Sequence, residues 1–130
     1  MTLYVNNSNP TSNALLLKNL ECSPSTYVGA AVRFQGGIVT PALADSIENS
    51  NVLGIVEEIF GNLAIVRTDG VSRSIYSGLD ESREYFLSDT IPGGLTVDVP
   101  VTPGHIALKI GTPVGNDRFY VQKGVRVIRS

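Results

Sequence analysis

The sequence predicts an all-β fold, a compact antiparallel sandwich or small barrel with an extended N-terminal arm. The 13 glycines and 7 prolines interrupt the chain so often that no apolar pattern of helical period persists over a typical helix length. The runs between these breaks are short and rich in Val, Ile, Tyr and Phe, which is the composition of strands bounded by turns. Two such runs meet across Gly61-Asn62, a two-residue link typical of a β-hairpin.

The first element is the arm, predicted over residues 1–26, and the β domain follows over residues 27–130. Residues 6–13 are polar and uncharged, so they bury little surface by themselves. Leu15, Leu16 and Leu17 follow, and we expect these three apolar side chains to contact a partner rather than water. The alternative is that this segment adds one more strand to the sheet.

Residues 52–76 are predicted to form a three-stranded meander, with turns at Gly61-Asn62 and Asp69-Gly70. Pairing outward from the turns gives one face that should be core, because side chains alternate along a strand. Its apolar residues are Ile55, Ile59, Ala64, Val66, Val71 and Ile75. The opposite face, which we expect to be an interaction surface, carries Phe60, Leu63, Tyr76, Glu58 and Arg67. A modest Glu58–Arg67 ion pair is predicted across it.

The rest of the chain continues the strand pattern. Strands are predicted at residues 84–88, 105–110 and 119–122, and Pro92-Gly93 fits the centre of a type II turn. The C-terminal run from Lys123 to Arg129 alternates valine or isoleucine with basic residues. We interpret it as an edge strand protected by charge, with a phosphate-binding strip as the less favoured alternative.

The composition excludes several classes of function. Only 17% of the 130 residues are charged, against about 25% in an average protein, so we expect a partner to cover part of a neutral surface. The net charge of −2 and the scattered basic residues argue against nucleic acid binding. No apolar run approaches the roughly 20 residues that cross a bilayer, and the N-terminus lacks the features of a signal peptide. We therefore expect a protein made in a cytoplasm and not bound to a membrane.

Few side chains are suited to catalysis. A Cys22–His105 dyad is the one nucleophile and base that the sequence offers, and structural roles are favoured for both residues. A single His and a single Cys cannot form a structural zinc site. Asp80 and Glu81 lie in a predicted turn, where an Asp commonly binds its own backbone. We expect no enzymatic activity, no cofactor and no metal.

Two stretches resemble proteins of tailed bacteriophages. The segment SGLDESREYFLSDTIPGGL at residues 77–95, with the later Pro103-Gly104 and Ile110-Gly111, resembles a module of virion proteins found in tail fibres, appendages and small head proteins. That pattern often has glycine where Glu81 or Ser82 stands here. More loosely, TYVGAAVRF at residues 26–34 and the segments after it are similar to the first half of small capsid cement proteins.

The resemblance implies a capsid decoration, or cement, protein. Such a protein forms a homotrimer on the capsid exterior of the virion, is made in the host cytoplasm, and binds the major capsid protein through a terminal arm. A tail fibre, baseplate or other appendage subunit is the first alternative. A glycan- or ligand-binding β domain is the second, with Tyr76, Tyr85 and Tyr120 as its candidate platform.

Overall fold

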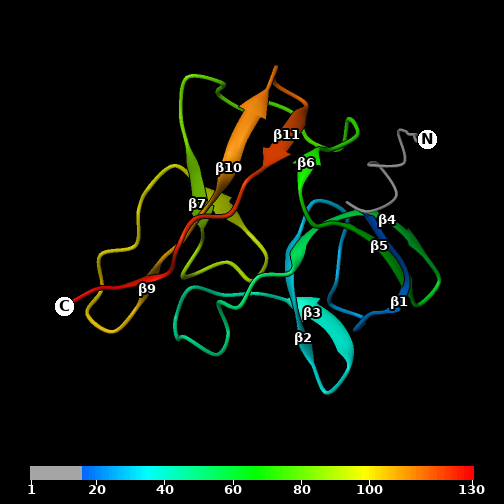
Figure 1. The fold of residues 1–130 in the computed structure, drawn as a ribbon, viewed down its shortest axis with the longest axis horizontal. Helices are drawn as coiled ribbons and strands as arrows, with labels where there is room; N and C mark the ends of the chain where they lie inside the picture. Colours follow the sequence, from blue (N-terminus) through cyan, green and yellow to red (C-terminus); the bar gives the residue numbers. More distant parts are fainter. Residues whose placement is uncertain (1–15) are drawn as a thin grey trace, which may run out of the picture.

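The computed structural model describes residues 16–130, and its strands confirm the predicted all-β class, with antiparallel pairing between neighbouring strands in each sheet (Figure 1). No helix occurs within this range. The strands are β1 (Leu16–Glu21), β2 (Ala31–Gln35), β3 (Ile38–Pro41), β4 (Gly54–Phe60), β5 (Leu63–Arg67), β6 (Gly70–Val71), β7 (Tyr85–Leu87), β8 (Leu95–Thr96), β9 (Ile106–Ala107), β10 (Lys109–Val114), β11 (Arg118–Val121) and β12 (Val127–Ile128).

The first sheet has the order β1-β5-β4-β2-β3 and curls until its two edges meet. A parallel bridge joins Cys22, just after β1, to Val39 in β3, and the Ser23 N–H donates to the Val39 carbonyl at 2.8 Å. The sheet is therefore close to a small barrel. Its interior is filled by Cys22, Ala30, Val32, Val39, Val56, Ala64 and Val66.

The second sheet has the order β6-β11-β10-β7-β8 and packs against the outside of this barrel. A larger core lies between the two sheets, with Phe119, Ile55 and Leu87 among its fully buried side chains. The remaining strands, β9 and β12, form a separate pair at the end of the molecule that holds the C-terminus (Figure 1). In the connection to β8, the Gly94 N–H donates to the Ile91 carbonyl and Gly93 has φ 74°, which confirms the turn predicted at Pro92-Gly93.

The register predicted for the β4–β5 hairpin is confirmed near its turn and wrong beyond it. Phe60 pairs with Leu63, and Glu58 pairs with Ile65, as expected. A β-bulge at Glu57 then shifts the pairing by one residue, so that Ile55 lies opposite Arg67. Ile55 therefore faces the second sheet rather than the barrel interior, where Val56 takes its place. Both side chains are fully buried because β4 lies between the two cores.

The predicted three-stranded meander is also corrected. After Asp69, strand β6 leaves β5 and pairs with β11 of the second sheet, with Val71 opposite Tyr120. Val71 is 43% exposed and does not join a core. The turn at Asp69-Gly70 is therefore a crossing between sheets, which a local pairing rule does not detect.

The segment from residue 16 belongs to the sheet rather than to a separate arm. Strand β1 pairs with β5, with Leu17 opposite Val66 and Leu20 opposite Ala64. The alternative of an added strand is thus confirmed for Leu16–Glu21, and the predicted boundary at residue 26 is too late. Residues 1–15, including Leu15, lie outside the described part of the chain.

Candidate functional site

The turn of the β4–β5 hairpin carries two exposed apolar side chains, Phe60 and Leu63, which we name the hairpin patch. They lie directly opposite each other, with Phe60 59% exposed and Leu63 36% exposed. Gly61 has φ 60°, a left-handed conformation that glycine adopts easily and that the tight turn requires. The hairpin thus holds an aromatic and an aliphatic side chain in water, although burial would be favourable for both.

The other predicted members of this face lie elsewhere. Tyr76 is half-buried under the second sheet, where its hydroxyl donates to the Gly29 carbonyl at 2.8 Å. Its ring contacts Phe119 edge to face, with the centroids 6.0 Å apart. Tyr76 is separated from the hairpin patch because the chain crosses to the other sheet at β6.

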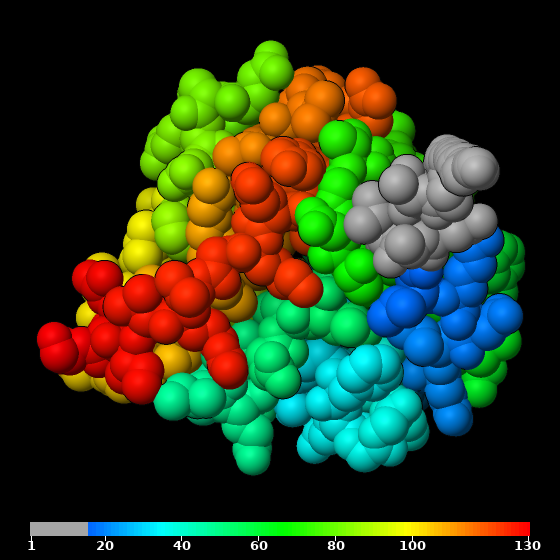
Figure 2. All heavy atoms as spheres, viewed as in Figure 1, coloured from blue at the N-terminus to red at the C-terminus, as the bar shows by residue number. Residues whose placement is uncertain are grey.

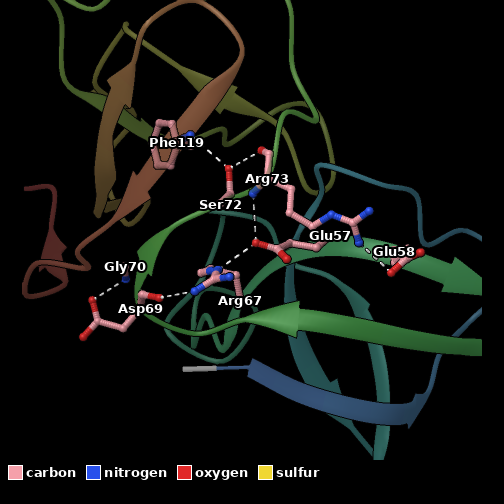
Figure 3. Close-up of polar contacts among 8 residues, drawn as sticks. All are labelled: Glu57, Glu58, Arg67, Asp69, Gly70, Ser72, Arg73 and Phe119. Carbon is pink, nitrogen blue, oxygen red and sulfur yellow. Dashed lines mark hydrogen bonds and ion pairs between the residues drawn. The ribbon is translucent and has the colours of Figure 1, made fainter. Parts of the chain in front are cut away.

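The predicted Glu58–Arg67 ion pair is wrong, and Figure 3 shows the partners that form instead. The bulge brings Glu57 to Arg67, whose Nε donates to Glu57 Oε2 at 2.7 Å. Glu58 turns to the surface and accepts a bond from Nη1 of Arg73 at 2.7 Å. The side chains of Glu57 and Arg67 are 1% and 11% exposed, so this pair is buried, whereas the Glu58 pair is open to solvent.

Glu57 also connects the two sheets. The same Oε2 atom accepts a bond from the Arg73 N–H at 3.2 Å, in the segment that follows β6. Next to it, the Ser72 hydroxyl accepts from the Phe119 N–H of β11 at 3.0 Å (Figure 3). The buried carboxylate therefore has two donors, which is the arrangement that makes a charge tolerable inside a protein. These contacts are structural, since they leave the carboxylate enclosed.

The leucines predicted to contact a partner are partly accessible. Leu16 is half-buried at the start of β1, and Leu17 is 37% exposed. Their strand is held by β5 on one side, so the contact surface they offer belongs to the barrel wall. Leu15 lies outside the described residues.

A small apolar pocket of about 200 Å³ lies between the two sheets. It is lined by Tyr27, Gly29, Tyr76, Leu79, Tyr85, Gly93, Gly94 and Leu95. Two of the tyrosines predicted as a ligand platform, Tyr76 and Tyr85, are thus brought together, while Tyr120 pairs with Val71 on another strand and does not line it. The sequence did not predict that Tyr27 lines this pocket, and the nearby Gly29 is the only sequence signal for it.

The floor of this pocket depends on glycine. A Cβ on Gly29 would lie 3.0 Å from Cε1 of Tyr76, and one on Gly93 would lie 2.9 Å from the Ala30 Cβ. The Tyr27 hydroxyl donates to the Pro92 carbonyl, at 2.8 Å. Burial raises the pKa of Tyr76 above its usual range, with smaller contributions from Tyr27 and Glu57, so this phenol stays neutral. The pocket therefore offers uncharged aromatic surface.

The structure does not bring Cys22 and His105 into contact. Cys22 lies in the barrel core, where burial, and to a lesser degree Glu21, raises the pKa of its thiol. His105 Nδ1 lies 2.9 Å from Asp89 Oδ2, at the end of the molecule near the C-terminus. A thiol kept protonated in an apolar core is a poor nucleophile.

The turn predicted for Asp80 is confirmed. Its Oδ1 accepts bonds from the backbone N–H and the hydroxyl of Ser82, at 3.0 and 2.6 Å, and these bonds lower the pKa of the carboxyl group. Glu81 accepts a bond from the Gly115 N–H at 3.2 Å. Asp80 thus holds its own turn in place, whereas Glu81 holds the distant turn between β10 and β11.

Within residues 16–130 no group of three or more His, Cys, Asp or Glu side chains is placed to hold a metal ion. The same residues include no helix that is long and apolar enough to cross a membrane. The chain matches no protein-family model, no curated protein and no solved structure.

Proposed function

We propose that the protein is a structural subunit of a tailed-phage virion, a decoration protein that binds the major capsid protein on the outside of the head and stabilises the shell. The observation that carries this proposal is the hairpin patch, Phe60 and Leu63, which is fixed in water by a tight turn. Exposed apolar side chains that lie next to each other on a rigid scaffold are typical of protein contact surfaces. Binding to the assembled shell would stabilise it by mass action.

The proposal includes self-association into a homotrimer and location on the capsid exterior. Support comes from the resemblance of residues 26–34 and 77–95 to phage virion modules and from the low charge of the chain, 17% of its residues. The same support fits a tail fibre, baseplate or other appendage subunit, because such proteins share the second module. A head-binding experiment separates these two locations.

The test uses undecorated heads and the purified chain. We expect saturable binding by the wild type and loss of binding in the Phe60→Ser/Leu63→Ser double variant. Ile91→Ser is the matched control, because Ile91 is an equally exposed apolar residue, at 62%, in a different turn. Deleting residues 1–15 tests the remaining part of the arm and leaves β1 intact. Wild-type protein that binds tails but not heads would support the appendage location, and binding to neither would refute the proposal.

The tyrosine pocket favours a second candidate function, the binding of a small ligand. Its surface is mostly apolar, and the hydroxyls of Tyr27, Tyr76 and Tyr85 already take part in protein hydrogen bonds. A ligand with an apolar ring or a sugar with a broad C–H face fits this surface. NMR titration with monosaccharides and small aromatic compounds tests it. Shifts that disappear in Tyr27→Ala support a ligand site, and an unperturbed spectrum opposes one.

A further inference from the structure

The C-terminal segment, residues 123–130, lies on the surface and ends in a strand with one free edge. Figure 2 shows it in red on the surface, and hydrogen bonds from Lys123 and Arg126 join it to the carbonyls of Leu53 and Ile47. Strand β12 pairs with β9 on one side, with Val127 opposite Ala107. It is the last strand of its two-stranded sheet, and no strand of residues 16–130 covers its other side.

The backbone hydrogen bonds define which groups face outward. The Arg129 N–H donates to the His105 carbonyl at 2.8 Å, toward β9. Successive residues of a strand direct their N–H and C=O groups to opposite sides. Ile128 therefore directs its N–H and C=O groups away from β9, toward the open edge. Unpaired edge groups of this kind are a template for another strand.

The side chains along the same edge are aliphatic and exposed. Val125 is 83% exposed, Val127 51% and Ile128 56%. Two hollows flank them, one of about 280 Å³ beside residues 123–126 and one of about 270 Å³ along residues 127–130. An added strand would cover these side chains and fill space that the fold leaves open.

Positive charge alternates with these aliphatic residues. Lys123 Nζ donates to the Leu53 carbonyl at 2.8 Å, and Arg126 Nη1 donates to the Ile47 carbonyl at 2.6 Å, so both cations are fixed against the domain. Neither these two nor Arg129 forms an ion pair with an acidic residue of the described chain. Within residues 16–130 the edge therefore presents three cations without a direct ion-pair partner; burial lowers the pKa of Lys123, and the nearby Asp69 carboxylate partly offsets this.

We propose that the open edge of β12 binds an extended segment of a partner protein whose side chains are acidic and aliphatic. The segment adds a strand to β9 and β12, using the outward N–H and C=O groups of Ile128 for main-chain bonds. Its aliphatic side chains cover Val125 and Val127, and its carboxylates pair with Arg126 and Arg129. This inference rests on the proposed function, because it names the kind of segment that a virion partner presents.

The positive charge of this edge argues against two other binding partners, a second copy of β12 and a nucleic acid. A second copy of β12 would place Arg126 and Arg129 of the two chains beside each other, and like charges across a strand pair are destabilising. Nucleic acid binding requires concentrated cations rather than cations interleaved with exposed valines. A strand with acidic and aliphatic side chains would pair with the arginines and also cover the exposed valines.

The test measures fluorescence anisotropy of a labelled peptide, Ser-Val-Val-Glu-Glu-Val-Val-Ser, which as a strand has one glutamate and two valines on each face. The control peptide has lysine in place of glutamate, and a single-stranded oligonucleotide tests phosphate binding. We expect saturable binding of the acidic peptide alone. Ile128→Pro removes the outward N–H and should weaken binding at least about tenfold, whereas Ile128→Val keeps the N–H and should bind as the wild type.

A charge variant makes the test independent of the proline. In Arg126→Glu/Arg129→Glu the preference should change from the acidic to the lysine peptide. Equal binding of both peptides, binding of the oligonucleotide alone, no binding, or unchanged binding by a folded Ile128→Pro variant would each overturn the inference. Binding to heads distinguishes failure of this inference from failure of the proposed function. If Ile128→Pro binds heads normally and Phe60→Ser/Leu63→Ser does not, only the inference is refuted. If the wild type binds the acidic peptide but not heads, only the proposed function is refuted.

Discussion

The buried Glu57–Arg67 pair yields the sharpest stability prediction. Replacing Glu57 by Ala removes the carboxylate that lies 2.7 Å from Arg67 Nε and 3.2 Å from the Arg73 N–H. Among the contacts of residues 16–130, the Arg67 side chain, 11% exposed, then keeps a 3.5 Å contact from Nη1 to the Asp69 carbonyl. An uncompensated buried charge of this kind costs about 3–5 kcal/mol, a large part of the roughly 5–15 kcal/mol that holds a domain folded.

Urea unfolding followed by far-ultraviolet circular dichroism measures this loss. The control is Glu58→Ala, whose ion pair with Arg73 is solvent-exposed and should contribute only about 0.2–1 kcal/mol. The double variant Glu57→Leu/Arg67→Met removes both charges, so its loss should be well below the sum of the two single losses. Equal effects of Glu57→Ala and Glu58→Ala, or strictly additive losses in the double variant, would refute the reasoning.

Three further predictions concern single sites. Gly54→Ala should lower the free energy of unfolding by at least about 1–3 kcal/mol, because the new Cβ would overlap the Arg67 carbonyl. Gly124→Ala is the control, since its new Cβ would lie 3.5 Å from the nearest atom and should not lower stability; thermal melts compare the two variants. The pKa of Tyr76 is raised on folding, so its contribution to stability is complete below about pH 10 and is lost as pH rises further; Tyr76→Phe should lack that alkaline loss in pH-dependent unfolding. Cys22 should react with a thiol reagent only after unfolding, and rapid reaction of the native protein would contradict its burial.

Local signals were sufficient for the fold class and for two of the predicted turns. Gly61-Asn62 and Pro92-Gly93 have the residue types that their turns require, and both turns occur where they were predicted. The exposed pair Phe60 and Leu63 followed from the first of them, because the register next to a tight turn is fixed by the turn itself.

The errors come from interactions between residues distant in sequence. Nothing in the residue types marks the bulge at Glu57, since a continuous register and a shifted one both bury valine and isoleucine when the strand has a core on each face. The bridge between Cys22 and Val39 and the pairing of β6 with β11 are likewise set by tertiary packing. The tyrosine pocket could be only partly predicted for the same reason, because Tyr27 reaches Tyr76 and Tyr85 across two sheets.

The position of β4 between the barrel and the second sheet has a consequence for how the molecule opens. Val56 contributes to one interior and Ile55 to the other, so neither half retains a complete wall if this strand detaches. The two halves should therefore melt as one cooperative unit, and the backbone amides of β4 should exchange with deuterium last, only through global unfolding. A domain built in this way keeps its surface in a fixed shape until the whole domain unfolds.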